Sequence, residues 1–322
     1  MAVPANTVLV SSRTNVKPDV EEVIKMISPV DTPVVTMAKP IKATGKYHEI
    51  LNDELANAAT NVNAEGDDDA ASASAALVRT ANRCQIVKST ASVSATSEVV
   101  GLYGYKSQMA YEMAKRAKSV KRDLEFAASR NQPSAAAGAG DTMAGLESSI
   151  ATNIVYSSAQ GAGATPGFVG GDTAAPTDTG NAAVALTEAK LKEAMRLAWN
   201  NGGQPDMMVV GPVTKQICSG FGGIASLYRD QSVNDMKPAS IMAAADVYVS
   251  DFGEIKIIPS RHSRGQTALL LDTVYLAMAT LRPWQTYELS KTGDNKKSSI
   301  VWEGCVVCQT EKAHAKIVNV TG

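Results

Sequence analysis

The sequence predicts an α+β fold organised around one long helix. Three observations indicate this fold class. Residues 99–130 carry apolar side chains at steps of three and four. Residues 44–97 hold two strand-like stretches around an acidic turn, and residues 187–322 alternate short helical and strand patterns. With 322 residues, the chain is long enough to bury a sizeable core in one large domain or two smaller ones.

The long helix is predicted to run from Val99 to Arg130. From Lys106 to Arg130 the chain contains no Gly or Pro, so intrinsic helix propensity agrees with the apolar pattern. About 30 residues at a rise of 1.5 Å each would make a rod of roughly 45 Å, which would span the protein. The residues of its apolar face are Leu102, Tyr105, Met109, Met113, Ala117, Val120, Leu124 and Ala127.

The first 43 residues are predicted to form an arm, because prolines interrupt them repeatedly and they lack a core of their own. A short helix is expected at about residues 19–26, after Pro18. The apolar residues near the end of the arm favour contact with a neighbouring subunit over a disordered terminus, which stays the alternative. These residues are Val30, Val34, Val35 and Met37.

Residues 44–97 are predicted to form a long two-stranded loop. One strand is expected at 46–51 and the return strand at 77–93, with the acidic stretch 65–69 near the tip. The interior is mostly Ala, Ser and Asn, and a two-stranded hairpin without a core is marginally stable. We therefore expect the loop to lie on another molecule.

The charges of the loop and of the helix have opposite signs. Residues 44–97 carry four basic and seven acidic side chains, whereas residues 99–130 carry seven basic and three acidic ones. This difference predicts that the loop of one subunit lies over the helix of the next, although two separately solvated faces would show the same charges. The candidate inter-subunit contacts are Glu65, Asp67, Asp68, Asp69, Lys115, Arg116, Lys118, Lys121 and Arg122.

The second half of the chain is predicted to form helices on a mixed sheet, after irregular connections around one ordered piece at 143–154. This second unit, residues 187–280, contains helices at 187–200 and 213–219 and strands at 206–210, 246–250, 254–259, 268–271 and 274–278. In the tail, which starts at residue 281, a strand at 300–310 is expected to pair with 315–320 across 311–314.

The patterns that resemble catalytic motifs do not form a site, so no enzyme, cofactor or metal site is predicted. Cys305 and Cys308 have metal-ligand spacing, but residues three apart on a strand point to opposite faces. Asp251-Phe252-Gly253 is better explained as a hairpin turn than as part of a kinase site. The sequence contains no Gly-rich phosphate loop, and its three histidines are far apart. Four scattered cysteines favour a reducing compartment, and no apolar run long enough to cross a membrane occurs.

Short motifs along most of the chain, in the order of parts just described, resemble a known family. The motifs are His48-Glu49-Ile50, Asp53-Glu54-Leu55-Ala56, Glu65-Gly66, Arg83-Cys84-Gln85-Ile86-Val87, Trp199-Asn200-Asn201-Gly202-Gly203-Gln204-Pro205-Asp206, Leu281-Arg282-Pro283-Trp284, Leu289-Ser290-Lys291-Thr292-Gly293-Asp294 and Glu311-Lys312-Ala313-His314. With the arm, loop and long helix, they resemble the major capsid proteins of tailed bacteriophages, which have the Hong Kong 97 fold.

The resemblance implies a division of the chain into parts with different roles. These are an N-terminal arm (1–43), an extended loop (44–97), a peripheral domain with the spine helix (98–186), an axial domain (187–280) and return strands of the peripheral domain (281–322).

The resemblance further implies self-assembly. Hexamers and pentamers would close an icosahedral head around double-stranded DNA, with each loop reaching over a neighbour. The formal net charge of −1 agrees with DNA contacts that are non-specific and weak. A separate scaffolding protein, a portal and decoration proteins are the implied further partners. The chain would be made in the bacterial cytoplasm and end in the virion. The alternatives are another phage structural role, such as a tail-tube or decoration protein, and a cytosolic enzyme with an unrecognised site.

Overall fold

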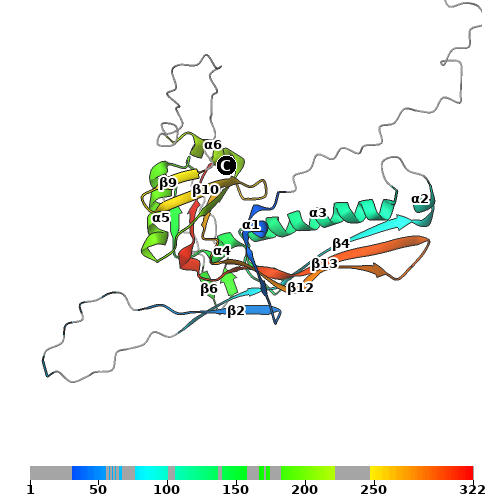
Figure 1. Ribbon diagram of the computed structural model, residues 1–322, viewed down its shortest axis with the longest axis horizontal. Coiled ribbons are helices and arrows are strands. Elements are labelled where there is room, and N and C mark those ends of the chain that lie inside the picture. Colours follow the sequence, from blue (N-terminus) through cyan, green and yellow to red (C-terminus); the bar gives the residue numbers. More distant parts are fainter. Residues whose placement is uncertain are drawn as a thin grey trace, which may run out of the picture.

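The protein has an elongated layer that extends from a rounder body (Figure 1). The computed structural model describes residues 31–55, 77–100, 106–136, 140–157, 183–221 and 247–321, together with two short strands near residue 170 and a few positions between 58 and 66. The layer contains the long helix and the longest strands. The body contains a six-stranded sheet with helices α5 and α6.

The elongated layer is a four-stranded sheet with strand order β1-β12-β13-β4. Its strands are β1 (Lys39–Lys42), β12 (Leu276–Leu289), β13 (Asn295–Cys308) and β4 (Gln85–Ser94). Strands β12 and β13 form an antiparallel hairpin whose register shifts between Thr280 and Gln285. Strand β1 pairs only with residues 277–280 of β12, so beyond the register shift β13 is the one described neighbour of β12.

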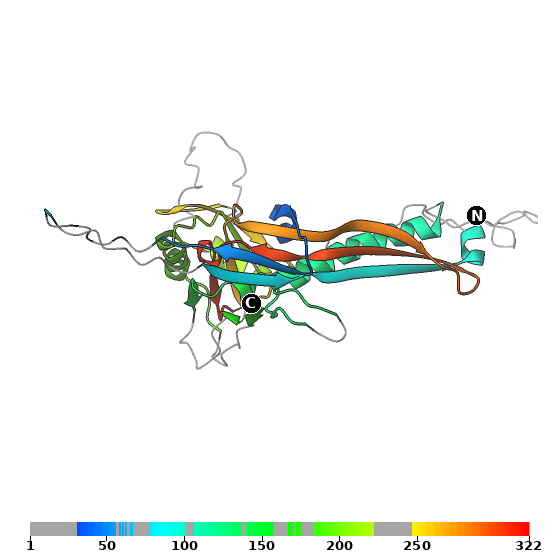
Figure 2. The ribbon, with the colours of Figure 1, turned by 90° about the horizontal axis from the view of Figure 1, so that it is seen from below.

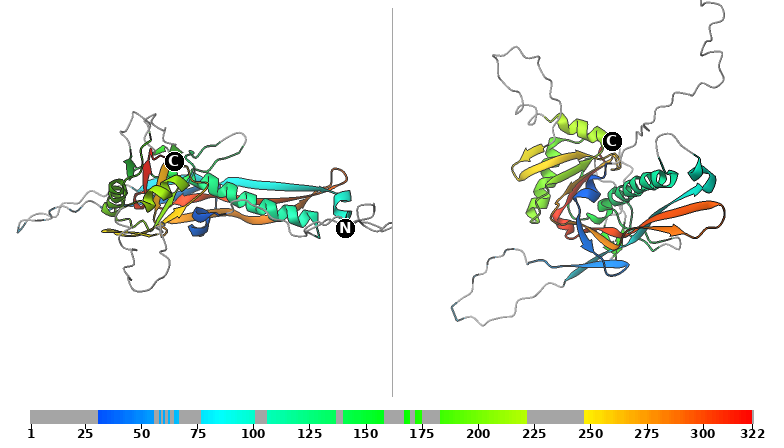
Figure 3. Two further views of the ribbon diagram at one scale, coloured as in Figure 1. Left: turned by 90° about the horizontal axis from the view of Figure 1, so that it is seen from above. Right: turned by 45° about the vertical axis from the view of Figure 1, so that its right-hand side comes forward.

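Helix α3 (Gln108–Ser129) lies along one face of this sheet. The strands lie in front of it in Figure 2, and the helix lies in front of the strands in the left view of Figure 3. Its packing face is the one that the apolar spacing predicted, because Met109, Val120, Leu124 and Ala127 are buried. Met113 packs against Ala91 and Val93 of β4. Leu102 and Tyr105 of the predicted face lie outside the described residues.

The start of the helix differs from the prediction. A continuous helix was expected from residue 99, but α2 (Ala95–Val99) ends there and α3 begins at Gln108. The 22 residues of α3 correspond to roughly 33 Å instead of 45 Å. The side chain of Ser107 accepts a hydrogen bond from the backbone N–H of Ala110 (3.3 Å), which fixes the new start. Two glycines in residues 101–104 lower helix propensity before it.

The six-stranded sheet of the body has strand order β5-β14-β11-β8-β10-β9. Its strands are β5 (Ile154–Tyr156), β14 (Ala315–Val318), β11 (Thr267–Leu271), β8 (Met207–Val210), β10 (Gly253–Pro259) and β9 (Val247–Ser250). Helices α5 (Glu188–Asn200) and α6 (Pro212–Ser219) contribute to its core, which also includes Met208, Ile255 and Leu270. Both helices and the hairpin β9–β10 lie where the sequence predicted them.

The pairing predicted for the tail is wrong. Residues 315–320 were expected to pair with the strand at 300–310, but β14 pairs with β11 and β5 in the body. The partners of β13 are β12 and β4, which occupy both of its edges. The cause is the length of β12, which was predicted to end at Met278 and instead continues to Leu289.

The return strand of the loop is divided between two sheets. It was predicted to run from residue 77 to 93, but it breaks at Cys84. The first part, β3 (Val78–Arg83), pairs with β2 (Tyr47–Asn52) in an antiparallel ribbon. The second part is β4, which belongs to the long sheet. The described two-stranded part of the loop therefore consists of residues 47–52 and 78–83.

Several short elements complete the described part of the chain, and two of them, α4 and η2, lie between strands or helices of the layer and of the body. They are α1 (Pro33–Met37), α4 (Leu146–Ser149), the 3-10 helix η2 (Glu311–Ala313), and the paired strands β6 (Gly167–Val169) and β7 (Asp172–Ala174). The ordered piece predicted at 143–154 contains α4 and the first residue of β5. The arm helix predicted at 19–26 lies outside the described residues.

Candidate assembly interface

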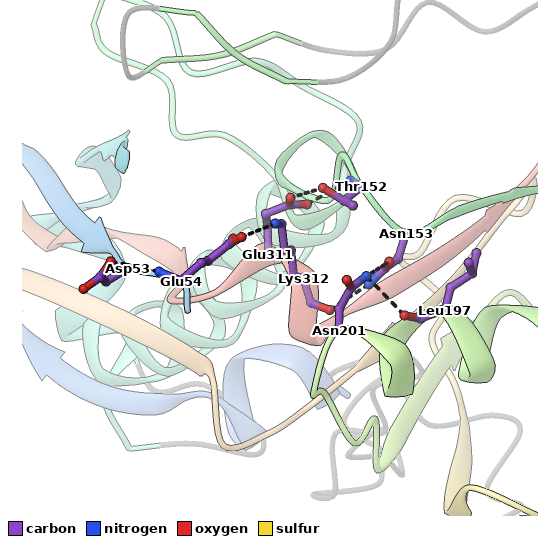
Figure 4. A network of polar contacts seen from close by, with 8 residues as sticks. All are labelled: Asp53, Glu54, Thr152, Asn153, Leu197, Asn201, Glu311 and Lys312. Carbon is purple, nitrogen blue, oxygen red and sulfur yellow. Dashed lines mark hydrogen bonds and ion pairs between the residues drawn. The ribbon is translucent and has the colours of Figure 1, made fainter. Parts of the chain in front are cut away.

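An ion pair fixes the root of the loop to the body. Lys312 Nζ lies 2.5 Å from Glu54 Oε2, directly after the end of β2 (Figure 4). Lys312 belongs to η2, which is itself tied to the body. Both side chains are partly exposed, so the ion pair adds little to the free energy of unfolding, and its main effect is to hold the start of the loop beside η2. The ribbon therefore leaves the body from a defined point.

A partly buried hydrogen-bond network holds η2 in place. The carboxylate of Glu311 accepts hydrogen bonds from the backbone N–H groups of Ala151 (2.9 Å) and Thr152 (3.0 Å), and from the Thr152 hydroxyl. The side-chain amide of Asn153 donates to the carbonyl oxygens of Lys312 (2.7 Å) and His314 (2.8 Å). These contacts join the segment before β5 to the segment before β14, so the anchor of the loop rests on two strands of the body.

The network extends to the end of α5. The side-chain amide of Asn201 donates to Asn153 Oδ1 (2.8 Å) and to the carbonyl oxygen of Leu197 (3.2 Å), as Figure 4 shows. Three of the sequence motifs thus meet in space, namely those that contain Glu54, Asn201 and Glu311. The sequence identified each motif but contained no signal that they form one contact.

The backbone of Gly203 packs directly against η2. A Cβ atom at this position would lie 2.5 Å from both the Cα and the carbonyl oxygen of Ala313, which is closer than such atoms pack. Neither neighbour can rotate away, since both belong to the backbone. We expect Gly203→Ala to displace η2 and to lower the free energy of unfolding by roughly 2 kcal/mol or more.

Denaturant unfolding would measure the effect of Gly203→Ala. Gly293→Ala is a matched control, because the nearest atom to a Cβ there is a side-chain atom at 3.8 Å and its φ is not positive. A Gly203→Ala variant as stable as this control would contradict the close approach.

His314 has a structural role in the same region. Its Nδ1 atom accepts a hydrogen bond from the backbone N–H of Asp272 (3.0 Å), and its side chain is fully buried. Burial lowers the pKa of His314 to about 4, so the imidazole is neutral at neutral pH. A neutral histidine in this position links η2 to the turn between β11 and β12.

The arm enters the molecule at a buried carboxylate. Glu125 of α3 is fully buried, and its two oxygens accept hydrogen bonds from the backbone N–H groups of Val34 (3.1 Å) and Val35 (2.9 Å). These groups lie in the first turn of α1, where backbone donors have no partner within the helix. The left view of Figure 3 shows α1 beside α3. In the sequence, Glu125 is one of three acidic residues of the predicted helix, and nothing in its spacing indicates this role.

The predicted basic side chains of the helix lie on its accessible face. Lys115, Arg116, Lys118 and Lys121 are exposed, and Arg122 is half-buried. No ion pair within the described residues involves any of these five side chains. On the predicted acidic partner, Glu65 is exposed, and Asp67, Asp68 and Asp69 lie outside the described residues. Among the described residues, no ion pair joins Glu65 to α3 of its own chain.

The basic surface continues past the end of α3. A depression of about 300 Å³ lies there, and the guanidinium of Arg130 stacks over the ring of Phe126 at 5.0 Å. The loop after β10 supplies the rest of the lining. Because this loop is far from α3 in the sequence, the sequence alone did not indicate that its arginines extend the basic surface of the helix. The lining residues are Phe126, Arg130, Arg261, His262, Ser263 and Arg264.

Within the described ranges, no three or more His, Cys, Asp or Glu side chains are grouped so that they could hold a metal ion. Among the helices that the structure describes, none is both long and apolar enough to cross a membrane. What the described surface offers is an anchored ribbon, a fixed arm and a basic helix face, and these are features of contact between macromolecules.

Comparison with known proteins agrees with this view. The family model of the SU10 major capsid protein matches residues 4–321. The capsid asymmetric unit of cyanophage A-1(L) superposes with a TM-score of 0.69 at 12% identity, over 95% of this chain and 98% of that chain. A structure of phage G major capsid and decoration proteins gives a TM-score of 0.57 at 11% identity, over 98% and 100%.

An encapsulin shares the fold as well. The encapsulin of Synechococcus elongatus gives a TM-score of 0.56 at 12% identity, over 95% of this chain and 93% of that chain. At these identities the structural matches show the fold alone. No curated protein sequence matches the chain significantly.

Proposed function

The chain belongs to the SU10 major capsid protein family and forms the icosahedral shell of a tailed bacteriophage, and from this premise we propose how its parts make the contacts of that shell. It is a structural protein of the virion capsid with the Hong Kong 97 type of fold. Membership of this family decides against the tail-tube, decoration and enzyme alternatives.

We assign the parts of the chain as follows. The arm is residues 1–43, the β2–β3 ribbon belongs to the extended loop, the long sheet with α3 is the peripheral domain, and the body is the axial domain. Compared with the division that the resemblance implied, β4 moves from the loop to the peripheral domain, and β5 and β14 move from the peripheral to the axial domain, because of the sheets in which these strands pair. The assignment is supported by the division of the chain between two sheets. In this arrangement six or five axial domains surround the centre of a hexamer or pentamer, and the peripheral domains join neighbouring capsomers.

The observation that carries the proposal is the exposure of the loop. Leu51 is 61% exposed, Leu55 98% and Val78 59%, in a ribbon of two strands. The inner end of the ribbon packs on the subunit through the buried residues Thr80, Ala81 and Asn82. Its outer end buries too little apolar surface to be stable alone, and exposed strands of this kind pair with or pack on other chains. A second copy of this chain would cover these residues when the loop lies over its peripheral domain.

We propose that charge sets where the loop lies. The acidic side chains of the tip, Glu65, Asp67, Asp68 and Asp69, would face the basic side chains of a neighbouring helix, Lys115, Arg116, Lys118, Lys121 and Arg122. Complementary charges of this kind fix register and raise association rates more than they raise affinity. The exposure of the cations on α3 supports this assignment.

A charge-swap experiment tests the contact. Lys118→Glu with Arg122→Glu is expected to abolish shells, because it places like charges opposite the tip. Adding Asp67→Lys and Asp68→Lys is expected to restore them. Shells are counted by negative-stain electron microscopy after expression of the full chain.

The control for the charge swap is Lys88→Glu, which reverses an exposed charge on β4, away from α3. It is expected to leave shells unchanged. Loss of shells without rescue by the second pair of substitutions would contradict the pairing of tip and helix. Absence of shells from the unmodified chain, with or without a co-expressed scaffolding protein, would count against self-assembly of this chain.

Further partners follow from the role of the protein. We propose that the chain is made in the host cytoplasm, assembles with a separate scaffolding protein and a portal, and contacts packaged double-stranded DNA without sequence specificity. The phage G structure contains decoration proteins together with the capsid protein, and this supports a decoration protein on the outside of the present shell.

A further inference from the structure

Two cysteines that are 221 positions apart in the sequence touch at the root of the loop. The sulfur atoms of Cys84 and Cys305 are in hydrogen-bond contact at 3.9 Å. Both side chains are buried, with exposures of 1% and 0%. Cys84 lies at the break between β3 and β4, and Cys305 lies in β13. The contact therefore joins the start of the loop ribbon to the long sheet.

The strand register places the two cysteines opposite each other. Gln85 pairs with Gly304 across the antiparallel strands β4 and β13, so the next positions along the two chains are Cys84 and Cys305. Opposed residues of an antiparallel pair have Cα atoms about 4.5–5.5 Å apart, which lies within the range that disulfides adopt. The sulfur atoms must approach by roughly 2 Å to bond, which side-chain rotation can supply.

Neither of the other cysteines competes for this pairing. Cys308 is three residues from Cys305 on the same strand and faces the other side of the sheet. Cys218 lies in α6, in the core of the body. Cys305 is therefore paired with Cys84 of the neighbouring strand, and not with Cys308, although Cys305 and Cys308 have metal-ligand spacing in the sequence.

The two thiols of the pair also differ in chemistry. The contact with Cys305 lowers the pKa of Cys84, whereas the same contact and burial raise the pKa of Cys305. Cys84 is therefore the thiol that ionises first and acts as the nucleophile.

We propose that Cys84 and Cys305 form a disulfide after the particle leaves the reducing interior of the host cell. The oxidant is a small disulfide. The Cys84 thiolate attacks one of its sulfur atoms and releases one small thiol. Cys305 then loses its proton and attacks Cys84 Sγ, which releases the second small thiol. The protein loses two electrons and two protons, and the small disulfide is reduced to two thiols.

Burial and chain topology set the properties of this bond. Because both sulfur atoms are buried, the oxidant reaches them only when the root of the loop opens, so the reaction is slow in the folded subunit. The bond closes a covalent loop of more than 200 residues, between positions 84 and 305. It therefore lowers the conformational entropy of the unfolded chain and stabilises the subunit.

Thiol counting tests the proposal on assembled particles. Particles are incubated with dithiothreitol or with oxidised glutathione, then unfolded and alkylated. The reduced chain is expected to carry four alkylated cysteines. The oxidised chain should carry two, and its digest should contain a peptide that links residues 84 and 305. Oxidation is expected to raise the unfolding midpoint by roughly 5 °C.

Serine variants separate this pair from a general effect of oxidation. Cys84→Ser and Cys305→Ser should each lose the rise in midpoint, whereas Cys218→Ser, the matched control at a buried thiol, should keep it. If a variant does not fold, peptide mapping of the oxidised unmodified chain still tests the proposal, because it detects whether residues 84 and 305 are linked. Four alkylated cysteines after prolonged oxidation, or a peptide that links Cys305 to Cys308, would overturn the proposal.

Discussion

A subunit that lacks residues 53–77 is expected to fold normally and to form no closed shells. Asn52 and Val78 face each other in the last pair of the β2–β3 register, so a two-residue Asn-Gly turn can rejoin the strands without strain. The deletion removes no member of the main cores, which contain residues from α3, β12, β13 and the body. It does remove the part of the chain that would cover a neighbour. Circular dichroism should be unchanged while negative stain shows only free capsomers or subunits.

A matched variant shows what the deleted segment contributes. Replacing residues 56–76 by a Gly-Ser segment of equal length keeps the Glu54–Lys312 ion pair and the reach of the loop, but removes the acidic tip. We expect this variant to assemble poorly as well. Its loop is long enough to extend to a neighbouring subunit but lacks the acidic side chains that we propose to face the basic helix α3 of that neighbour. Shells of normal size from the deletion variant would show that the loop is dispensable.

Replacement of Glu125 by Ala is expected to release the arm and to destabilise the subunit by roughly 2–4 kcal/mol. The substitution leaves the buried N–H groups of Val34 and Val35 without their acceptors and opens a cavity between α1 and α3. Chemical denaturation measures the loss, and limited proteolysis before residue 38 detects the freed arm. Asp123→Ala, at an exposed position of the same helix, is the control and should change stability little.

The effect of pH separates the charge of Glu125 from its hydrogen bonds. Burial raises the pKa of Glu125, although the two backbone donors oppose this shift. A carboxyl group whose pKa is raised in the folded state binds more protons there than in the unfolded chain, so its contribution to stability falls as pH rises. The stability of the unmodified protein relative to Glu125→Gln should therefore decrease from acidic to neutral pH. A constant difference across this range would contradict the raised pKa.

Local patterns predicted the elements whose stability is local. The apolar steps of three and four identified the buried face of α3, and the turn at Asp251 identified the β9–β10 hairpin. The start of α3 was misplaced because the apolar pattern continues through residues 99–105, while the cap at Ser107 decides where the helix begins. The apolar periodicity therefore overestimated the length of α3, because the N-cap at Ser107 sets where the helix begins.

Contacts between distant segments could not be predicted from one sequence. The pairing of β14 with β11 depends on which strand edges remain free after β12 and β4 flank β13. Similarly, the contact between Glu54 and Lys312 joins residues 258 positions apart. The family resemblance predicted the architecture. The contacts that the motifs with Glu54, Asn201 and Glu311 make with one another could be seen only in the structure.

The interrupted ladder between β12 and β13 makes the long layer unequally stiff along its length. Up to Thr280, β12 pairs on both edges, with β1 and β13, and from Gln285 onward β13 is its one partner among the described residues. A lattice that places identical chains at sites of different curvature must strain each copy differently. We expect this strain to concentrate where the fewest backbone hydrogen bonds resist it, so that the far half of the β12–β13 hairpin bends while the anchored root of the loop keeps its geometry.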